Sequence, residues 1–164
     1  MSFKLGDIID DVLRREGGAA STNRKNDRGG RTQYGISEKS NPEAWKDGKV
    51  TEDEARAIYI AKYVTAPGFD KITDVRLQHQ LVDFGVLSGP RVATQKLQEI
   101  LGVPPDGMLG PITFAAIAAR SARELNNLLV VQRVKLIGRI CKNDSRQLEN
   151  LNGWLNRALD FLIP

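Results

Sequence analysis

Two carboxylates and a hydroxyl near the N-terminus are the residues of this chain best suited to chemistry. Glu16 ends a segment with an apolar stripe, Asp27 follows in a glycine-rich polar loop, and Thr32 comes where a short strand is expected. A protonated glutamic acid facing an ionised aspartate is the pair that hydrolysis of a glycosidic bond requires. One carboxyl protonates the leaving oxygen, and the other assists water or stabilises positive charge. The Thr32 hydroxyl would orient the attacking water.

The position of Glu16 on its expected helix supports the acid role. The apolar stripe of this helix consists of Leu5, Ile8, Ile9, Val12 and Leu13. At about 100° per residue, Glu16 falls about 20° from Leu5 and points with the stripe. We expect a raised pKa for Glu16, because apolar neighbours desolvate the charged form and the helix C-terminus is negative. The alternative is an ion pair between Glu16 and a distant arginine or lysine.

Each further candidate also has an ordinary structural reading. Taken singly, Asp27 suits a turn and Thr32 suits any strand. Tyr34 either lines a cleft or caps a small hairpin, while Tyr59 and Tyr63 share one helical face that core packing would also explain. The order of Glu, Asp and Thr favours the catalytic reading for these three residues together.

The remaining pattern predicts a mainly α protein with one small β-hairpin wing. A Thr51–Glu54 capping box opens a helix that runs through Tyr63, and Ser121–Glu124 opens a long second one. Further helices are expected from about 75 to 86, from 89 to 101, after 110 and near the C-terminus. We expect two helical lobes, 1–75 and 76–164, packed as one globule.

Composition narrows the class of function. The chain has 164 residues, 41% of them hydrophobic and 27% charged, with a net charge of +4. This positive charge favours polyanionic partners such as nucleic acid or bacterial wall polymers. Because no run of Lys and Arg exceeds two residues, a nucleic-acid helix has little support. A single cysteine, Cys141, and a single histidine, His79, argue against a Cys/His metal cage, and we expect Cys141 to be a buried thiol.

The hydropathy pattern indicates where in the cell we expect the protein to be made. No apolar run approaches the ~18 residues of a membrane span, and the N-terminus lacks the apolar core of a signal peptide. We therefore expect synthesis in the cytoplasm, with export or release depending on other factors.

Three motifs give the sequence a family resemblance. Glu16-Gly17-Gly18, Asp27-x-Gly29-Gly30-x-Thr32 and Tyr34-Gly35-Ile36-Ser37 resemble the signature of glycoside hydrolase family 108, a family of bacterial and phage peptidoglycan muramidases. Their order also resembles that of phage-type lysozymes. Further matching motifs run along the chain: Ala66-Pro67-Gly68-Phe69-Asp70, Asp83-Phe84-Gly85, Ser88-Gly89, Leu101-Gly102-Val103, Leu109-Gly110-Pro111 and Gly153-Trp154-Leu155-Asn156-Arg157. The segment from Leu81 to Ile117 is similar to a predicted peptidoglycan-binding region, although its Asp-Gly and Gly-Pro turns also serve as ordinary helix punctuation.

The resemblance implies a lysozyme-like fold and cleavage of the β-1,4 bond between N-acetylmuramic acid and N-acetylglucosamine in peptidoglycan. It assigns catalysis to Glu16, Asp27 and Thr32, and substrate binding to Tyr34, Tyr63 and Ser88. It implies no metal or cofactor, and a monomer that acts in the periplasm or cell wall after release. Two departures are Val64, where an aromatic residue is expected after Tyr63, and Leu87, where asparagine often precedes Ser88.

Three alternatives stay open at this point. A lytic transglycosylase would use one glutamate and no water. A non-catalytic wall-binding or secretion-accessory protein would bind peptidoglycan without cutting it, and a nucleic-acid binder is the weakest candidate. For the hydrolase, carboxyl groups about 6.5–9.5 Å apart would indicate inversion and ~5–5.5 Å retention. We expect inversion, because the loop between Glu16 and Asp27 leaves room for a wider gap.

Overall fold

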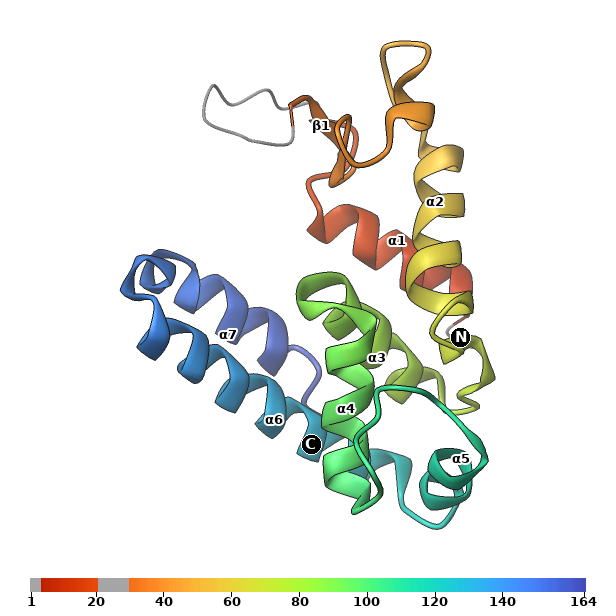
Figure 1. The fold of residues 1–164 in the computed structure, drawn as a ribbon, viewed down its shortest axis with the longest axis vertical. Helices are drawn as coiled ribbons and strands as arrows, with labels where there is room; N and C mark the ends of the chain where they lie inside the picture. The colour runs from red at the N-terminus through yellow and green to blue at the C-terminus, as the bar shows by residue number, and fades with distance from the viewer. Residues whose placement is uncertain (1–3, 21–29) are drawn as a thin grey trace. The chain divides into compact units, whose positions relative to one another are not determined.

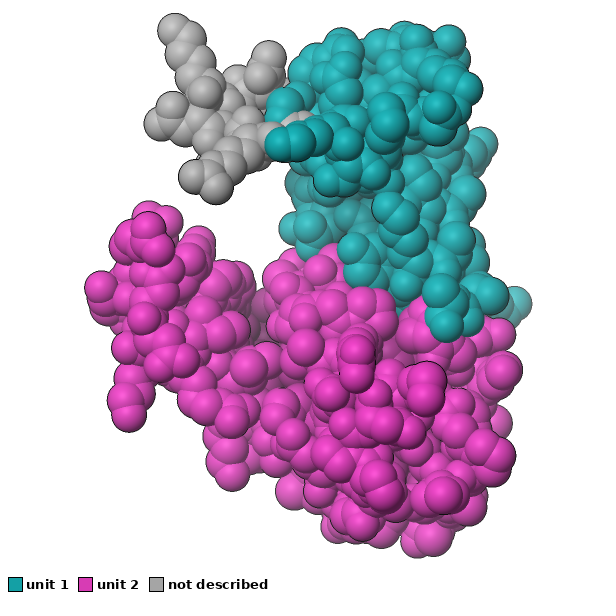
Figure 2. All heavy atoms as spheres, viewed as in Figure 1, with its two compact units in different colours: residues 1–66 teal, residues 67–164 magenta. Residues whose placement is uncertain are grey.

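The computed structural model describes residues 4–20 and 30–164. The fold is mainly helical with one small antiparallel sheet, as the sequence pattern predicted. The chain forms two compact units, Met1–Ala66 and Pro67–Pro164 (Figure 2). The lobe boundary expected after residue 75 stays a prediction. No helix in the described ranges is long and apolar enough to cross a membrane.

The first unit is built on two α-helices and the wing (Figure 1). Its elements are α1 (Leu5–Arg15), β1 (Thr32–Gln33), β2 (Ile36–Ser37), the 3-10 helix η1 (Pro42–Trp45), α2 (Glu52–Ile60) and the π-helical turn η2 (Ala61–Thr65). The predicted stripe of α1 is buried except for the half-buried Leu5, and α1 packs against α2. The predicted capping box begins α2: Thr51 Oγ1 accepts from the Glu54 N–H at 3.3 Å, and the Glu54 carboxylate accepts from the Thr51 N–H at 2.8 Å.

The wing is a hairpin with the shortest ordinary connection. Gln33 pairs with Ile36, so only Tyr34 and Gly35 join the two strands. Both have positive φ, 52° and 73°, as a type I′ turn requires, and this turn matches the twist of the strands. Trp45 anchors the wing, because its buried indole N–H donates to the Ile36 carbonyl at 3.2 Å.

The second unit is a helical assembly centred on α3, α4 and α6. Its elements are η3 (Phe69–Lys71), α3 (Val75–Ser88), α4 (Pro90–Leu101), α5 (Pro111–Ala118), α6 (Ala122–Asn143), η4 (Ser145–Asn150) and α7 (Leu151–Leu159). Only half of the second predicted capping box forms. Ser121 Oγ accepts from the Glu124 N–H at 3.4 Å, whereas Arg120 binds the Glu124 carboxylate at 2.7 Å.

The hairpin of α6 and α7 has a small core of its own (Figure 1). Cys141 is buried there, as predicted, beside Ile137 and Ala158. Trp154 packs against this cluster but is only partly buried. Trp154 also lines a cavity beside this cluster.

A buried carboxylate ties three helices of the second unit together. The Asp83 side chain on α3 is fully buried and binds Arg133 of α6 at 2.6 Å and Arg157 of α7 at 2.9 Å. The Arg133 guanidinium also lies over the rings of Phe84 and Phe161, at 5.2 Å from each centroid. Since each charge has left water, removing one partner leaves the others uncompensated in a medium of low dielectric constant.

We predict that Asp83→Asn lowers the free energy of unfolding by about 3–5 kcal/mol, the usual cost of breaking a buried ion pair. Glu124→Gln is the matched control, because it removes an exposed partner of Arg120 and should cost less than about 1 kcal/mol. Chemical denaturation of the full chain, followed by circular dichroism, measures both. Equal losses would contradict the role given to Asp83.

Candidate active site

Glu16 stands where α1 ends and the chain reverses. Its N–H donates to the Val12 carbonyl at 3.0 Å, which completes the last helical turn. Gly17 and Gly18 follow with φ of 95° and 57°, conformations that glycine adopts without a steric penalty. The Gly18 carbonyl then accepts from the Tyr34 N–H at 3.0 Å, so this reversal is bonded to the turn of the wing. The helix end and the wing thereby hold a half-buried Glu16 side chain between them.

The backbone of Gly35 lies directly against the Glu16 side chain. A Cβ at position 35 would lie 2.9 Å from Glu16 Cβ and 3.1 Å from Glu16 Oε2. It would also come within 2.6 Å of the Tyr59 hydroxyl, which itself donates to the Tyr34 carbonyl at 2.9 Å. Only glycine leaves room for this approach, so the glutamate motif and the wing motif meet at one point in space.

Tyr34 is the one described non-glycine residue with positive φ. This left-handed conformation costs an L-residue about 1–2 kcal/mol, and it persists because Gly18 and Tyr59 hold both backbone polar groups of Tyr34. Tyr34 also lines a hollow of about 230 Å³ on the first unit. Charged side chains of α1 and α2 line this hollow too, among them the Asp10–Arg56 ion pair.

Tyr63 lies within the electrostatic reach of Glu16. Burial raises the pKa of the Tyr63 phenol, and the negative charge of Glu16 raises it further. Tyr63 therefore keeps its proton well above neutral pH and remains a hydrogen-bond donor. Its ring lies beside that of Tyr59, with centroids 5.5 Å apart. It is carried by η2, where Ala66 donates to Ala61 in the wider i→i−5 pattern, and such π turns are frequent at functional sites.

The remaining predicted site residues are Thr32, Asp27 and Ser88. Thr32 lies on β1 opposite Ser37 and is half-buried, so it belongs to the same wing as Gly35. Asp27 lies outside the described residues. Ser88 ends α3 in the second unit and lines a separate cavity there. The catalytic roles of Glu16, Asp27 and Thr32 and the binding roles of Tyr34, Tyr63 and Ser88 remain predictions.

Tyr59 is a site residue that the sequence pattern assigned mainly to core packing. Its ring is indeed buried, at 4% exposure, but its hydroxyl fixes the turn of the wing. The available signal was chemical: a buried tyrosine hydroxyl needs a hydrogen-bond partner, whereas phenylalanine would serve a purely apolar site. As for metals, no three His, Cys, Asp or Glu side chains gather as ligands within the described part of the chain.

We predict that Glu16→Gln lowers the pKa of the Tyr63 phenol. The substitution removes the negative charge that disfavours tyrosinate and leaves the larger effect, burial, in place. Ultraviolet titration of tyrosinate measures the shift, and Tyr63→Phe identifies which transition belongs to Tyr63. An unchanged titration in Glu16→Gln would contradict the proximity of the two side chains.

Gly35→Ala tests the close approach itself. The matched control is Gly48→Ala, because Gly48 has nearly the same φ, 75° against 73°, and its added Cβ would meet only Arg31 Nη1 at 3.9 Å. The control should lose about 1–2 kcal/mol from backbone strain alone. Gly35→Ala should lose more, because Tyr59 and Glu16 must also move. Thermal unfolding of both variants decides, and equal losses would refute a tight contact.

Comparison with known proteins places these features in families. Residues 9–89 match the family model described as Glycosyl hydrolase 108, and residues 92–159 match the model described as Predicted Peptidoglycan domain. Among solved structures, that of Brucella abortus SagA is similar, with 28% identity and a TM-score of 0.69 over 95% of this chain and 94% of that one. No curated protein matches the chain. Residues 9–89 therefore carry the signature of the glycosyl hydrolase 108 family and residues 92–159 that of a predicted peptidoglycan domain, on a mainly helical, lysozyme-like fold.

Proposed function

We propose that this protein is an N-acetylmuramidase that hydrolyses the β-1,4 bond between N-acetylmuramic acid and N-acetylglucosamine in peptidoglycan. One observation carries the proposal: the Glu16 carboxyl group is held at the meeting point of a helix end, the turn of the wing and two tyrosines. Membership of a glycosyl hydrolase family supports the reaction class. The predicted peptidoglycan domain supports the substrate class.

Glu16 acts as the general acid in this proposal. It protonates the glycosidic oxygen as the bond to the anomeric carbon breaks, so the leaving sugar departs as an alcohol. The Gly35 backbone lies against the Glu16 side chain and limits the space open to its carboxyl group, and such preorganisation lowers the cost of reaching the transition state. Tyr63 presents a protonated phenol nearby and supplies a hydrogen bond to a sugar hydroxyl or amide.

Asp27 and Thr32 act on the water molecule that attacks the anomeric carbon. The ionised Asp27 carboxylate accepts a proton from the attacking water, and the Thr32 hydroxyl orients that water. Attack from the face opposite the leaving group gives inversion at the anomeric carbon. The long polar segment between Glu16 and Asp27 supports this outcome, since it allows a wider separation of the carboxyl groups.

The second unit retains the enzyme on its polymer substrate. Its predicted peptidoglycan domain supports this role, and the net charge of +4 adds attraction to anionic wall polymers. We propose a monomer that acts in the periplasm or cell wall after release from the cytoplasm.

We predict that Glu16→Gln folds normally but clears purified cell walls about 10²–10⁴-fold more slowly, the loss expected for a missing general acid. Glu43→Gln is the control, because Glu43 is an exposed acid of the same unit that forms a surface ion pair with Lys46. Turbidity of wall suspensions measures both variants. Clearing by Glu16→Gln at the wild-type rate would remove Glu16 from the mechanism.

Analysis of the products separates the remaining alternatives. A hydrolase releases muropeptides with reducing ends, whereas a lytic transglycosylase leaves anhydro ends that mass spectrometry detects by the missing water. A non-catalytic wall-binding or secretion-accessory protein would bind walls and release no sugar. Reducing ends from the wild type, formed about 10²–10⁴-fold more slowly by Glu16→Gln, are the expected result.

A further inference from the structure

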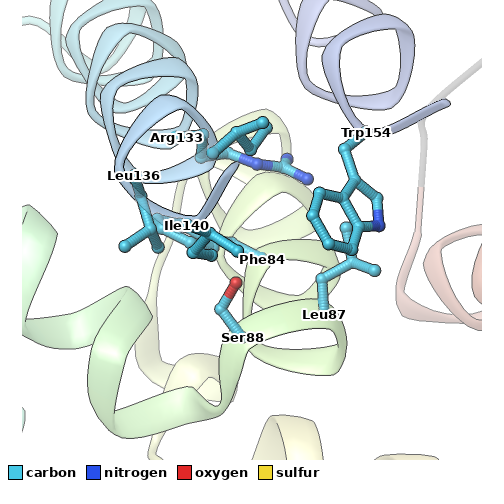
Figure 3. A pocket seen from close by; sticks show the side chains of 8 residues that line it. Phe84, Leu87, Ser88, Arg133, Leu136, Ile140 and Trp154 are labelled. Carbon is cyan, nitrogen blue, oxygen red and sulfur yellow. The ribbon is translucent and has the colours of Figure 1, made fainter. Parts of the chain in front are cut away.

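A cavity in the second unit lies outside the machinery proposed for catalysis. It measures about 100 Å³ and opens between the end of α3, the middle of α6 and the start of α7. Its walls are mostly carbon, and Trp154 and Leu87 close one side (Figure 3). The Ser88 hydroxyl and the Arg133 guanidinium are among the polar groups that line it.

The charge at this cavity is offset within the protein. The Arg133 side chain is 2% exposed and binds the fully buried Asp83 carboxylate at 2.6 Å. A guanidinium already paired in this way has a weaker pull on a second anion than an unpaired one would have. The cavity therefore suits a neutral group that carries a hydrogen-bond acceptor, with an apolar part to fill the carbon-lined space.

The size of the cavity selects among such groups. An engineered apolar cavity of ~150 Å³ holds a benzene ring of six carbon atoms, so about 100 Å³ accommodates an acetamido group but not a whole sugar ring. The sugar ring itself would have to stay at the mouth. There Trp154, which is only partly buried, offers a flat apolar surface with a polar edge.

We propose that this cavity binds the N-acetyl group of an amino sugar of the peptidoglycan strand. The methyl group packs among Phe84, Leu87 and Ile140, the acetamido carbonyl accepts from the Ser88 hydroxyl, and the pyranose ring lies against Trp154. The proposal rests on the proposed function only in taking peptidoglycan as the ligand. It locates a recognition site on the second unit that operates whether or not Glu16 is catalytic.

Binding is tested in the Glu16→Gln background, so that little substrate is consumed during the measurement. The probes are purified cell walls, measured by co-sedimentation, and a fully N-acetylated chitin tetramer, measured by tryptophan fluorescence. Trp154 reports on the cavity, whereas the other tryptophan, Trp45, is buried in the first unit. We expect the tetramer to change the fluorescence and its de-N-acetylated form to bind roughly tenfold more weakly or worse.

Three variants separate recognition from folding. Trp154→Ala should weaken binding of both probes about tenfold or more, the loss typical of a buried aromatic anchor. Ser88→Leu should do the same without lowering the melting temperature, because it fills the cavity with an apolar side chain. Leu159→Ala is the control on the same helix, since Leu159 is 46% exposed and lies outside the cavity lining.

The results of these binding tests can be separated from the results that test the muramidase mechanism. Undiminished binding by a folded Ser88→Leu variant, or equal affinity for the acetylated and de-N-acetylated tetramers, would overturn the cavity assignment. Wild-type wall clearing by Glu16→Gln would overturn the muramidase mechanism and leave the binding results standing. Loss of binding in Trp154→Ala and Ser88→Leu, with Leu159→Ala unaffected, supports the site.

Discussion

The first unit depends on one contact, the approach of the Gly35 backbone to the side chains of Glu16 and Tyr59. The wing turns through two residues with positive φ, and the second of them, Gly35, has no side chain at the contact. The helix end, the wing and α2 can therefore share a space that a single additional carbon atom would fill. The position of the carboxyl group is a consequence of this packing, since neither the helix nor the loop alone would fix it.

Much of this arrangement was predictable from the sequence. The apolar period of α1 and the capping box at Thr51 are local signals, and local signals survive in the folded chain. The wing was predictable as a hairpin, and its motif singled out Gly35. The tertiary contacts were not predictable in the same way. That Tyr59 bonds the turn of the wing depends on residues 25 positions apart, and no periodicity encodes such a meeting.

In the second unit, too, the helices were predictable from the sequence but the contacts between distant residues were not. Helix boundaries followed from Pro, Gly and capping residues, so α3, α4 and α6 lie where the pattern placed them. The ion pairs of Asp83 link partners 50 and 74 residues away. The helical spacing of Trp154 does not distinguish a core position from a cavity wall, and its side chain contributes to both. Whether a helical aromatic faces a filled core or a cavity is decided by the volume of the side chains opposite.

The π-helical turn that carries Tyr63 has a consequence for how this chain tolerates change in length. A π turn accommodates one residue more than the α-helical path between the same two ends. Loss of Ala61 or Lys62 would let the segment relax into regular α-helix and keep its hydrogen bonding. The phenol would then swing by about 100° around the helix axis, away from its acidic neighbour. Regular helical hydrogen bonding therefore does not need this extra residue, but the position of the Tyr63 phenol near Glu16 does.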